Sequence, residues 1–162
     1  MRWLKHLIAR TGAARHFPPK TLDAIQHAIA ASEHRHFGEI CFAVEGGLPL
    51  AEIVAGRQPR ARAEAAFARL RVWDTEHNTG VLVYVLIADH AIEIVADRGI
   101  AAKVAEPEWS AICALMQRAF AADDYEKGAL DGVAAITEIL ARHFPSDGQR
   151  NPDELPDRPV FL

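Results

Sequence analysis

Residues 80–87 read Gly-Val-Leu-Val-Tyr-Val-Leu-Ile, and this run decides how the chain folds. Both alternating sets of side chains are apolar, which is typical of a strand that is buried on both faces. Residues 39–45, Glu-Ile-Cys-Phe-Ala-Val-Glu, form a second strand candidate of the same kind. Residues 92–96, Ile-Glu-Ile-Val-Ala, follow the first run after a short connection and indicate an antiparallel return strand.

Helical patterns lie between and after these strands. Apolar residues recur at helical spacing in four segments, at about residues 21–35, 59–72, 107–121 and 124–144. The helix between the first two strands makes them parallel, joined by a right-handed crossover. The sequence therefore predicts an α/β fold around a small mixed sheet, which combines a parallel crossover with an antiparallel hairpin. Ten apolar residues are expected to share one core: Ile40, Phe42, Phe67, Val83, Val85, Ile94, Trp109, Met116, Val133 and Ile136.

The charge of the chain is unevenly distributed. The 162 residues, a length typical of one domain, carry a net charge of −4. Residues 1–22 contain five basic residues and no acid, so residues 23–162 carry a net charge of −9. Because so acidic a domain repels the phosphate backbone of nucleic acids, no nucleic-acid partner is expected. The 2 cysteines lack the spacing of a zinc site, and no apolar run reaches the ~20 residues of a membrane-spanning helix.

Residues 1–17 form a basic amphipathic segment. On a helix, one face collects the apolar residues Trp3, Leu4, Leu7 and Ile8. Lys5 and His6 interrupt the apolar stretch, which excludes a signal peptide and makes the cytoplasm the expected location. Two interpretations stay open: a peripheral contact with anionic lipid at the inner membrane face, or a terminal helix packed on its own domain.

Residues 146–162 form a polar, proline-rich tail that follows a domain body of residues 18–145. The tail finishes in three apolar residues, Val160-Phe161-Leu162. Because a free tail gains nothing from apolar side chains, we expect the tail to dock on the domain, in a groove or along an exposed strand of the sheet.

An antiparallel return strand brings residues 97–99 beside the loop of residues 73–79. That loop is rich in side-chain oxygens, and calcium takes six to eight oxygen ligands from flexible loops. The candidate metal ligands are Asp74, Glu76, Asn78 and Asp97, and the further site candidates are Thr75, Arg98 and Gly99. The same residues are also compatible with a solvated turn and an ordinary ion pair at the end of a strand.

Two other groups are set aside on the sequence alone. Glu33, His34, His36 and Glu39 are close in sequence, but histidines two apart diverge on a helix, so this segment is predicted to be a solvated helix end. Cys113 lies on an apolar helical face and is expected in the core. The sequence has no motif of a catalytic nucleophile or a phosphate-binding loop, so no catalytic residue is assigned.

The ordered set of motifs resembles the TPM domain family, which is named for thylakoid, photosystem-repair and receptor-modulator members. The resemblance covers about residues 20–162. It is carried by the run of residues 62–100, RAEAAFARLRVWDTEHNTGVLVYVLIADHAIEIVADRGI, by Trp109, Gly128 and residues 143–145, and by the ending NPDELPDRPVFL, which is similar to a cytoplasmic-looking bacterial branch.

The resemblance implies a three-layer α/β/α sandwich. For some members it also implies calcium or another divalent ion in the polar loops, and for plant relatives acid phosphatase activity. This sequence departs from the family pattern at three places, each of which lacks an oxygen ligand: residues 17–22 replace a paired acid motif, Asn78-Thr79-Gly80 replaces Asp-Asn-Gly, and Ala101 replaces an acid.

Three functions follow from these observations. The first is a binding or accessory module that binds calcium or magnesium weakly and serves an unidentified protein partner in membrane or envelope protein maintenance. The second is a weak metal-dependent acid phosphatase in which Asp74, Asn78 and Asp97 hold the ion. The third is a purely structural subunit. We favour the first, because phosphate ester hydrolysis also needs groups that stabilise charge in the transition state.

Overall fold

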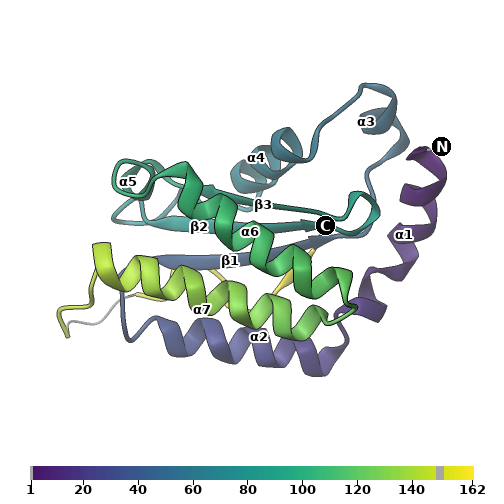
Figure 1. Cartoon of the computed structure of the whole chain (residues 1–162). Helices are drawn as coiled ribbons and strands as arrows, with labels where there is room; N and C mark the ends of the chain where they lie inside the picture. Colours follow the sequence, from purple (N-terminus) through teal and green to yellow (C-terminus); the bar gives the residue numbers. More distant parts are fainter. Residues whose placement is uncertain (1, 149–151) are drawn as a thin grey trace.

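A mixed sheet with the strand order β3-β2-β1-β4 organises the chain (Figure 1). The computed structural model describes residues 2–148 and 152–162. β1 (Glu39–Glu45) and β2 (Gly80–Leu86) are parallel, and β3 (Ala91–Ala96) returns antiparallel to β2. The predicted crossover and hairpin are therefore confirmed. β1 and β2 begin where β3 ends, and we call this side the amino end of the sheet and the opposite side its carboxyl end.

Helices cover both faces of this sheet. They are α1 (Arg2–His16), α2 (Pro19–Ser32), α3 (Leu50–Val54), α4 (Pro59–Arg69), α5 (Arg98–Ala101), α6 (Glu106–Ala121) and α7 (Tyr125–His143), with a short 3₁₀ helix, η1 (Ile87–Asp89). In Figure 1, α2, α6 and α7 lie on one face of the sheet, and α4 lies on the other. The fold is thus the expected α/β/α sandwich.

The alternation of side chains along the strands creates two hydrophobic clusters. Phe42 and Val83 face α2, α6 and α7 in the larger cluster, whereas Leu82 and Tyr84 face α4 in the smaller one. The expectation of one shared core is wrong for Phe67, which is partly buried and belongs to the cluster on the α4 side. Its position follows from the sheet itself, because a sheet covered on both faces separates the two sets of side chains.

Some element boundaries differ from the sequence prediction. α2 ends at Ser32 rather than near residue 35, and α4 ends at Arg69 rather than at residue 72. Arg71 has a positive φ of 57°, which no α-helix continues through. The short helices α3 and α5 were not expected. α5 begins because the Asp97 carboxylate accepts a hydrogen bond from the Arg98 N–H at 2.7 Å and caps the helix.

α1 packs on the carboxyl end of the sheet, against η1, α3 and the end of β1. It uses the side that carries His6 and Ala13, both of which are buried. The face with the apolar residues Trp3, Leu4, Leu7 and Ile8 is exposed. Among the described residues, no helix is both long enough and apolar enough to cross a membrane.

The tail returns along the open side of β1. β4 (Val160–Phe161) pairs with β1 in parallel, and the Leu162 N–H donates to the Val44 carbonyl at 2.9 Å. Before β4, Leu155 is buried and Arg158 forms an ion pair with Asp23 of α2 at 2.6 Å. Residues 152–157 thereby lie at the amino end of the sheet, next to the start of β1.

Candidate functional site

The loop before β2 and the turn after β3 meet at the amino end of the sheet. The Asp97 N–H donates to the Gly80 carbonyl at 2.8 Å, and the Gly99 N–H donates to the Asn78 carbonyl at 3.1 Å. A Cβ atom at Gly99 would lie 2.5 Å from that carbonyl oxygen, so only glycine permits this approach. The two segments expected to flank an ion are therefore neighbours.

The loop of residues 73–79 is held by its own hydrogen bonds. Asp74 forms an ion pair with Arg71, and both side chains are exposed. The Thr75 hydroxyl accepts a hydrogen bond from the Thr79 N–H at 3.0 Å. The Glu76 N–H donates to the carboxylate of Glu154, at 3.0 and 3.2 Å, while the Glu76 side chain is exposed. These contacts are those of an ordered polar turn that also holds the tail.

Arg98 connects the two segments. Its guanidinium donates two hydrogen bonds to the Asn78 side-chain oxygen, at 3.1 and 3.0 Å. Asn78 has a positive φ of 54°, a conformation that asparagine tolerates better than most residues. Asp97 Oδ1 caps α5, and Asp97 Oδ2 is buried without a hydrogen-bond partner among the described residues. Ion binding by Asp74, Glu76, Asn78 and Asp97 stays a prediction.

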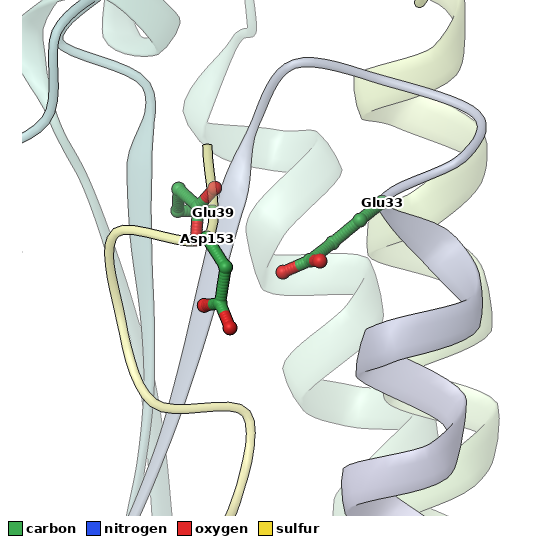
Figure 2. A group of neighbouring side chains, drawn as sticks. All are labelled: Glu33, Glu39 and Asp153. Atoms are coloured by element: carbon green, nitrogen blue, oxygen red, sulfur yellow. The ribbon is translucent and has the colours of Figure 1, made fainter. Parts of the chain in front are cut away.

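Three other carboxylates gather at the same end of the sheet (Figure 2). Glu33 at the end of α2, Glu39 at the start of β1 and Asp153 in the tail each place one carboxylate oxygen within 4.8 Å of the others. Within residues 2–148 and 152–162, no other group of three histidine, cysteine or acidic side chains brings its ligand atoms this close. Glu39 is only 1% exposed, Glu33 is half-buried and Asp153 is exposed. We call this group the acidic triad.

Burial and mutual repulsion perturb the acidic triad. Burial, followed by the charges of Asp157 and Glu39, raises the pKa of Glu33 to about 8. Burial raises the pKa of Glu39 to about 7, although the backbone N–H of Leu155 opposes that rise. Glu33 Oε1 and Asp157 Oδ1 are both buried without a hydrogen-bond partner among the described residues. Burial and the neighbouring negative charges therefore favour the protonated forms of Glu33 and Glu39, and a bound cation would oppose that effect.

A cavity of about 530 Å³ opens beside the loop that precedes β2. Its lining comes from the connection between α2 and β1, the loop before β2, the end of α7 and the tail: Phe37, Glu76, His77, Thr79, Phe144, Asp147 and Pro152. Glu76 belongs to the predicted ion site, whereas Phe37 and Pro152 neighbour the acidic triad in sequence. The cavity therefore exposes Glu76 of the predicted ion site to solvent, and none of the three acids of the triad lines it.

The sequence did not identify the acidic triad as a site. The prediction of a solvated helix end is wrong for Glu39 and His36, both of which are buried, and it holds for the exposed His34. Burial lowers the pKa of His36 to about 4, so its imidazole is neutral at pH 7. One signal for this site was available in the sequence. Glu39 is the first residue of a strand that is apolar on both faces, and an acid at that position is expected to be buried between the layers.

The comparisons with known proteins agree with this fold. The chain matches the family model of the TPM domain over residues 12–139. It is also similar to the solved NMR structure of the BA42 protein from the psychrophilic bacterium Bizionia argentinensis, with 27% sequence identity and a TM-score of 0.75. That similarity covers 88% of this chain and 93% of BA42. The comparison with curated proteins finds no match. Since the family model spans most of the chain, the protein belongs to the TPM domain family.

Proposed function

We propose that this protein is an accessory module that binds a divalent cation weakly through the acidic triad and acts in the maintenance of membrane or envelope proteins. The observation that supports the proposal is the convergence of Glu33, Glu39 and Asp153 from three separate segments of the chain. A cation bound there connects α2, β1 and the tail. Cation binding and docking of the tail are therefore linked.

The chemistry of the acidic triad favours a hard cation. Calcium accepts carboxylate and water oxygens in flexible geometry, whereas magnesium requires a near-octahedral arrangement and retains its waters. The cation takes the place of the proton on Glu33, so its affinity falls as the pH decreases. With three carboxylates, one of them exposed, we propose a dissociation constant of about 10⁻³ M, the range of low-affinity calcium modules.

The loop residues form a second candidate position for the ion. Asp74, Glu76, Asn78 and Asp97 would supply the oxygens, and the buried, unpaired Asp97 Oδ2 atom supports this position. Against it, the Asn78 oxygen is already bound to Arg98, and Asp74 is paired with Arg71. We therefore place the ion at the acidic triad and use the loop residues to test that choice.

Thermal unfolding and calorimetric titration of the full chain with calcium, magnesium and manganese test the proposal. At a calcium concentration ten times the dissociation constant, binding stabilises the fold by about 1.4 kcal/mol and raises Tm by about 3–6 °C. Glu39→Gln and Asp153→Asn should abolish this rise. Asp97→Asn and the exposed control Glu64→Gln should retain it. Glutamine at position 39 still accepts the hydrogen bond of the Leu155 N–H, so this variant is expected to fold.

Each result has a defined meaning. If calcium no longer raises Tm in Asp97→Asn and Asp74→Asn but still raises it in Glu39→Gln and Asp153→Asn, the ion binds at the loop and not at the acidic triad. No change of Tm and no heat of binding with any of the three ions would reject cation binding altogether. Release of phosphate from a phosphomonoester by the calcium-, magnesium- or manganese-loaded protein, lost in Glu39→Gln, would replace the accessory role with the metal-dependent phosphatase.

A further inference from the structure

Large apolar side chains are exposed along one side of α1. Trp3, Leu4, Leu7 and Ile8 are between 45% and 65% exposed. α3 contacts α1, and it exposes two more apolar residues, Leu50 and Val54, the latter to 80%. We call these six residues the α1–α3 surface. Exposed large apolar side chains gathered on two neighbouring helices are typical of an interaction site.

The orientation of α1 is set by a polar residue on its opposite side. The His6 side chain is fully buried, and its Nδ1 atom accepts a hydrogen bond from the Leu48 N–H at 3.0 Å. Its Nε2 atom lies 3.0 Å from a carboxylate oxygen of Asp89. Gly47 lies directly against the α1 backbone, since a Cβ atom there would be 2.3 Å from the His6 carbonyl oxygen. The helix is thus docked through the side that carries His6, Ala9 and Ala13, and the side with the larger apolar residues faces outward.

The charge around the α1–α3 surface is positive. Residues 1–22 have five basic residues and no acid, and Lys5 and Arg15 of α1 are exposed. Of the neighbouring acids, Glu52 of α3 forms an ion pair with Arg57 at 2.6 Å, and Asp89 lies 3.0 Å from Nε2 of the buried His6. The rest of the chain carries −9, so the molecule is strongly polarised.

We propose that the α1–α3 surface docks the protein on anionic lipid bilayers. A basic helix with tryptophan and leucine on its outer side lies in the plane of the headgroups, with its apolar side chains about 5–10 Å deep and its basic residues on the anionic lipids. A second copy of the chain is a poorer occupant, because a symmetric pairing of this surface would bring two strongly positive helices together. This inference deepens the membrane role proposed above and does not depend on the cation.

The position of the surface suits such docking. Figure 1 shows α1 and α3 together at one side of the molecule, whereas α5 and the tail segment that follows α7 lie at the opposite side. The α1–α3 surface is at the carboxyl end of the sheet, and the acidic triad is at the amino end. When α1 and α3 rest on a bilayer, the acidic triad at the amino end of the sheet faces away from the membrane and remains accessible.

Vesicle co-sedimentation of the full chain, in the presence of a chelator, tests the proposal. The protein should sediment with phosphatidylcholine vesicles that contain phosphatidylglycerol and not with pure phosphatidylcholine vesicles. The double variant Leu7→Ser/Ile8→Ser should lose the binding, whereas Trp73→Ser should retain it, because Trp73 is equally exposed but lies in the loop before β2. Lys5→Glu should weaken binding by about tenfold or more, and the distant control Lys103→Glu should have little effect.

Tryptophan emission gives an independent measure. Trp3 and Trp73 are exposed and Trp109 is buried, so in a Trp73→Phe background a blue shift on anionic vesicles reports the insertion of Trp3. Glu39→Gln should still bind vesicles, and Leu7→Ser/Ile8→Ser should still gain stability from calcium, which separates this proposal from the cation site.

Three results would overturn membrane docking. They are no co-sedimentation with anionic vesicles, equal binding of the wild-type chain and Leu7→Ser/Ile8→Ser, and a dimer in analytical ultracentrifugation that this double variant converts to a monomer. The last result would assign the α1–α3 surface to a second copy of the chain.

Discussion

The backbone N–H of Leu48 donates a hydrogen bond to Nδ1 of His6, and this contact joins α1 to the connection that follows β1. Both residues are buried. An amphipathic helix normally packs with its apolar side inward. Here one buried histidine on the other side supplies the polar contacts of the docked helix, so the apolar side chains of α1 remain on the surface.

Substitution of His6 should therefore destabilise the fold more than substitution of an exposed histidine does. His6→Ala leaves the Leu48 N–H without its acceptor and Asp89 without the imidazole, which costs about 2–4 kcal/mol and lowers Tm by about 5–15 °C. Thermal unfolding measures this change, and His34→Ala is the control because His34 is exposed. Faster hydrogen exchange of the Leu48 amide should accompany the loss. Equal melting temperatures for the two variants would contradict this role of His6.

The stability of the protein should decrease as the pH rises from about 6.5 to 8. The pKa of Glu33 is raised from 4.5 to about 8, so the folded state holds a proton that the unfolded state has already released. Glu39 acts in the same direction up to about pH 7. His36, whose pKa is lowered to about 4, acts in the opposite direction but only below pH 6.5, outside this window.

Urea unfolding of wild type and Glu33→Gln across this window measures the effect. Glu33→Gln should flatten the pH dependence by about 1 kcal/mol, a value reduced because Glu33 is only half-buried. Glu64→Gln, an exposed change on α4, should leave the dependence as it is. A free energy of unfolding that rises with pH in the wild type would show that Glu33 is ionised in the folded state.

Two valines provide a matched test of the sandwich. Val85 in β2 is 2% exposed, and an unpaired carboxylate at that position costs several kcal/mol, so Val85→Asp should not fold. Val54→Asp makes the same chemical change on the exposed end of α3 and should fold with nearly unchanged Tm. Circular dichroism and thermal unfolding compare the two. A cooperative melt of Val85→Asp would contradict the central position of β2.

Removal of residues 159–162 should lower the melting temperature. The deletion removes β4, the Leu162 hydrogen bond to Val44 and the buried Pro159. Partial loss of these contacts should cost about 1–3 kcal/mol, or about 3–10 °C in Tm. Phe161→Ala is the control, because the Phe161 ring is half exposed and contributes less. An unchanged melting curve of the deletion would show that β4 adds nothing to the sheet.

The strands were predictable because their apolar patterns are strong and local. The residues of β1 and β2 are buried throughout, as continuous apolar runs between two layers require. The order of strand, helix and strand then fixed the parallel pairing through the rule of right-handed crossovers, and the short connection fixed the hairpin. From these pairings alone, Gly99 could be placed beside Asn78.

The acidic triad was not predictable by the same means. Glu33 and Glu39 are six positions apart across the connection between α2 and β1, and Asp153 approaches them because the tail packs back on the domain through Glu154, Leu155 and β4. No local pattern encodes that approach. The side of α1 that packs was equally hidden, since one histidine outweighs four apolar residues there. Contacts between segments distant in sequence decide both features.

The pairing of β4 with β1 also bears on the order in which the chain folds. β1 pairs with β2 soon after both have been synthesised, but its other side waits for Val160 and Phe161, which emerge from the ribosome much later. Until then, the β1 backbone presents unpaired N–H and carbonyl groups, the template on which strands of other chains aggregate. β4 pairs with Ala43 and Val44 and so covers this part of the β1 edge. Anything that holds the tail in place shortens the time for which newly made molecules expose it.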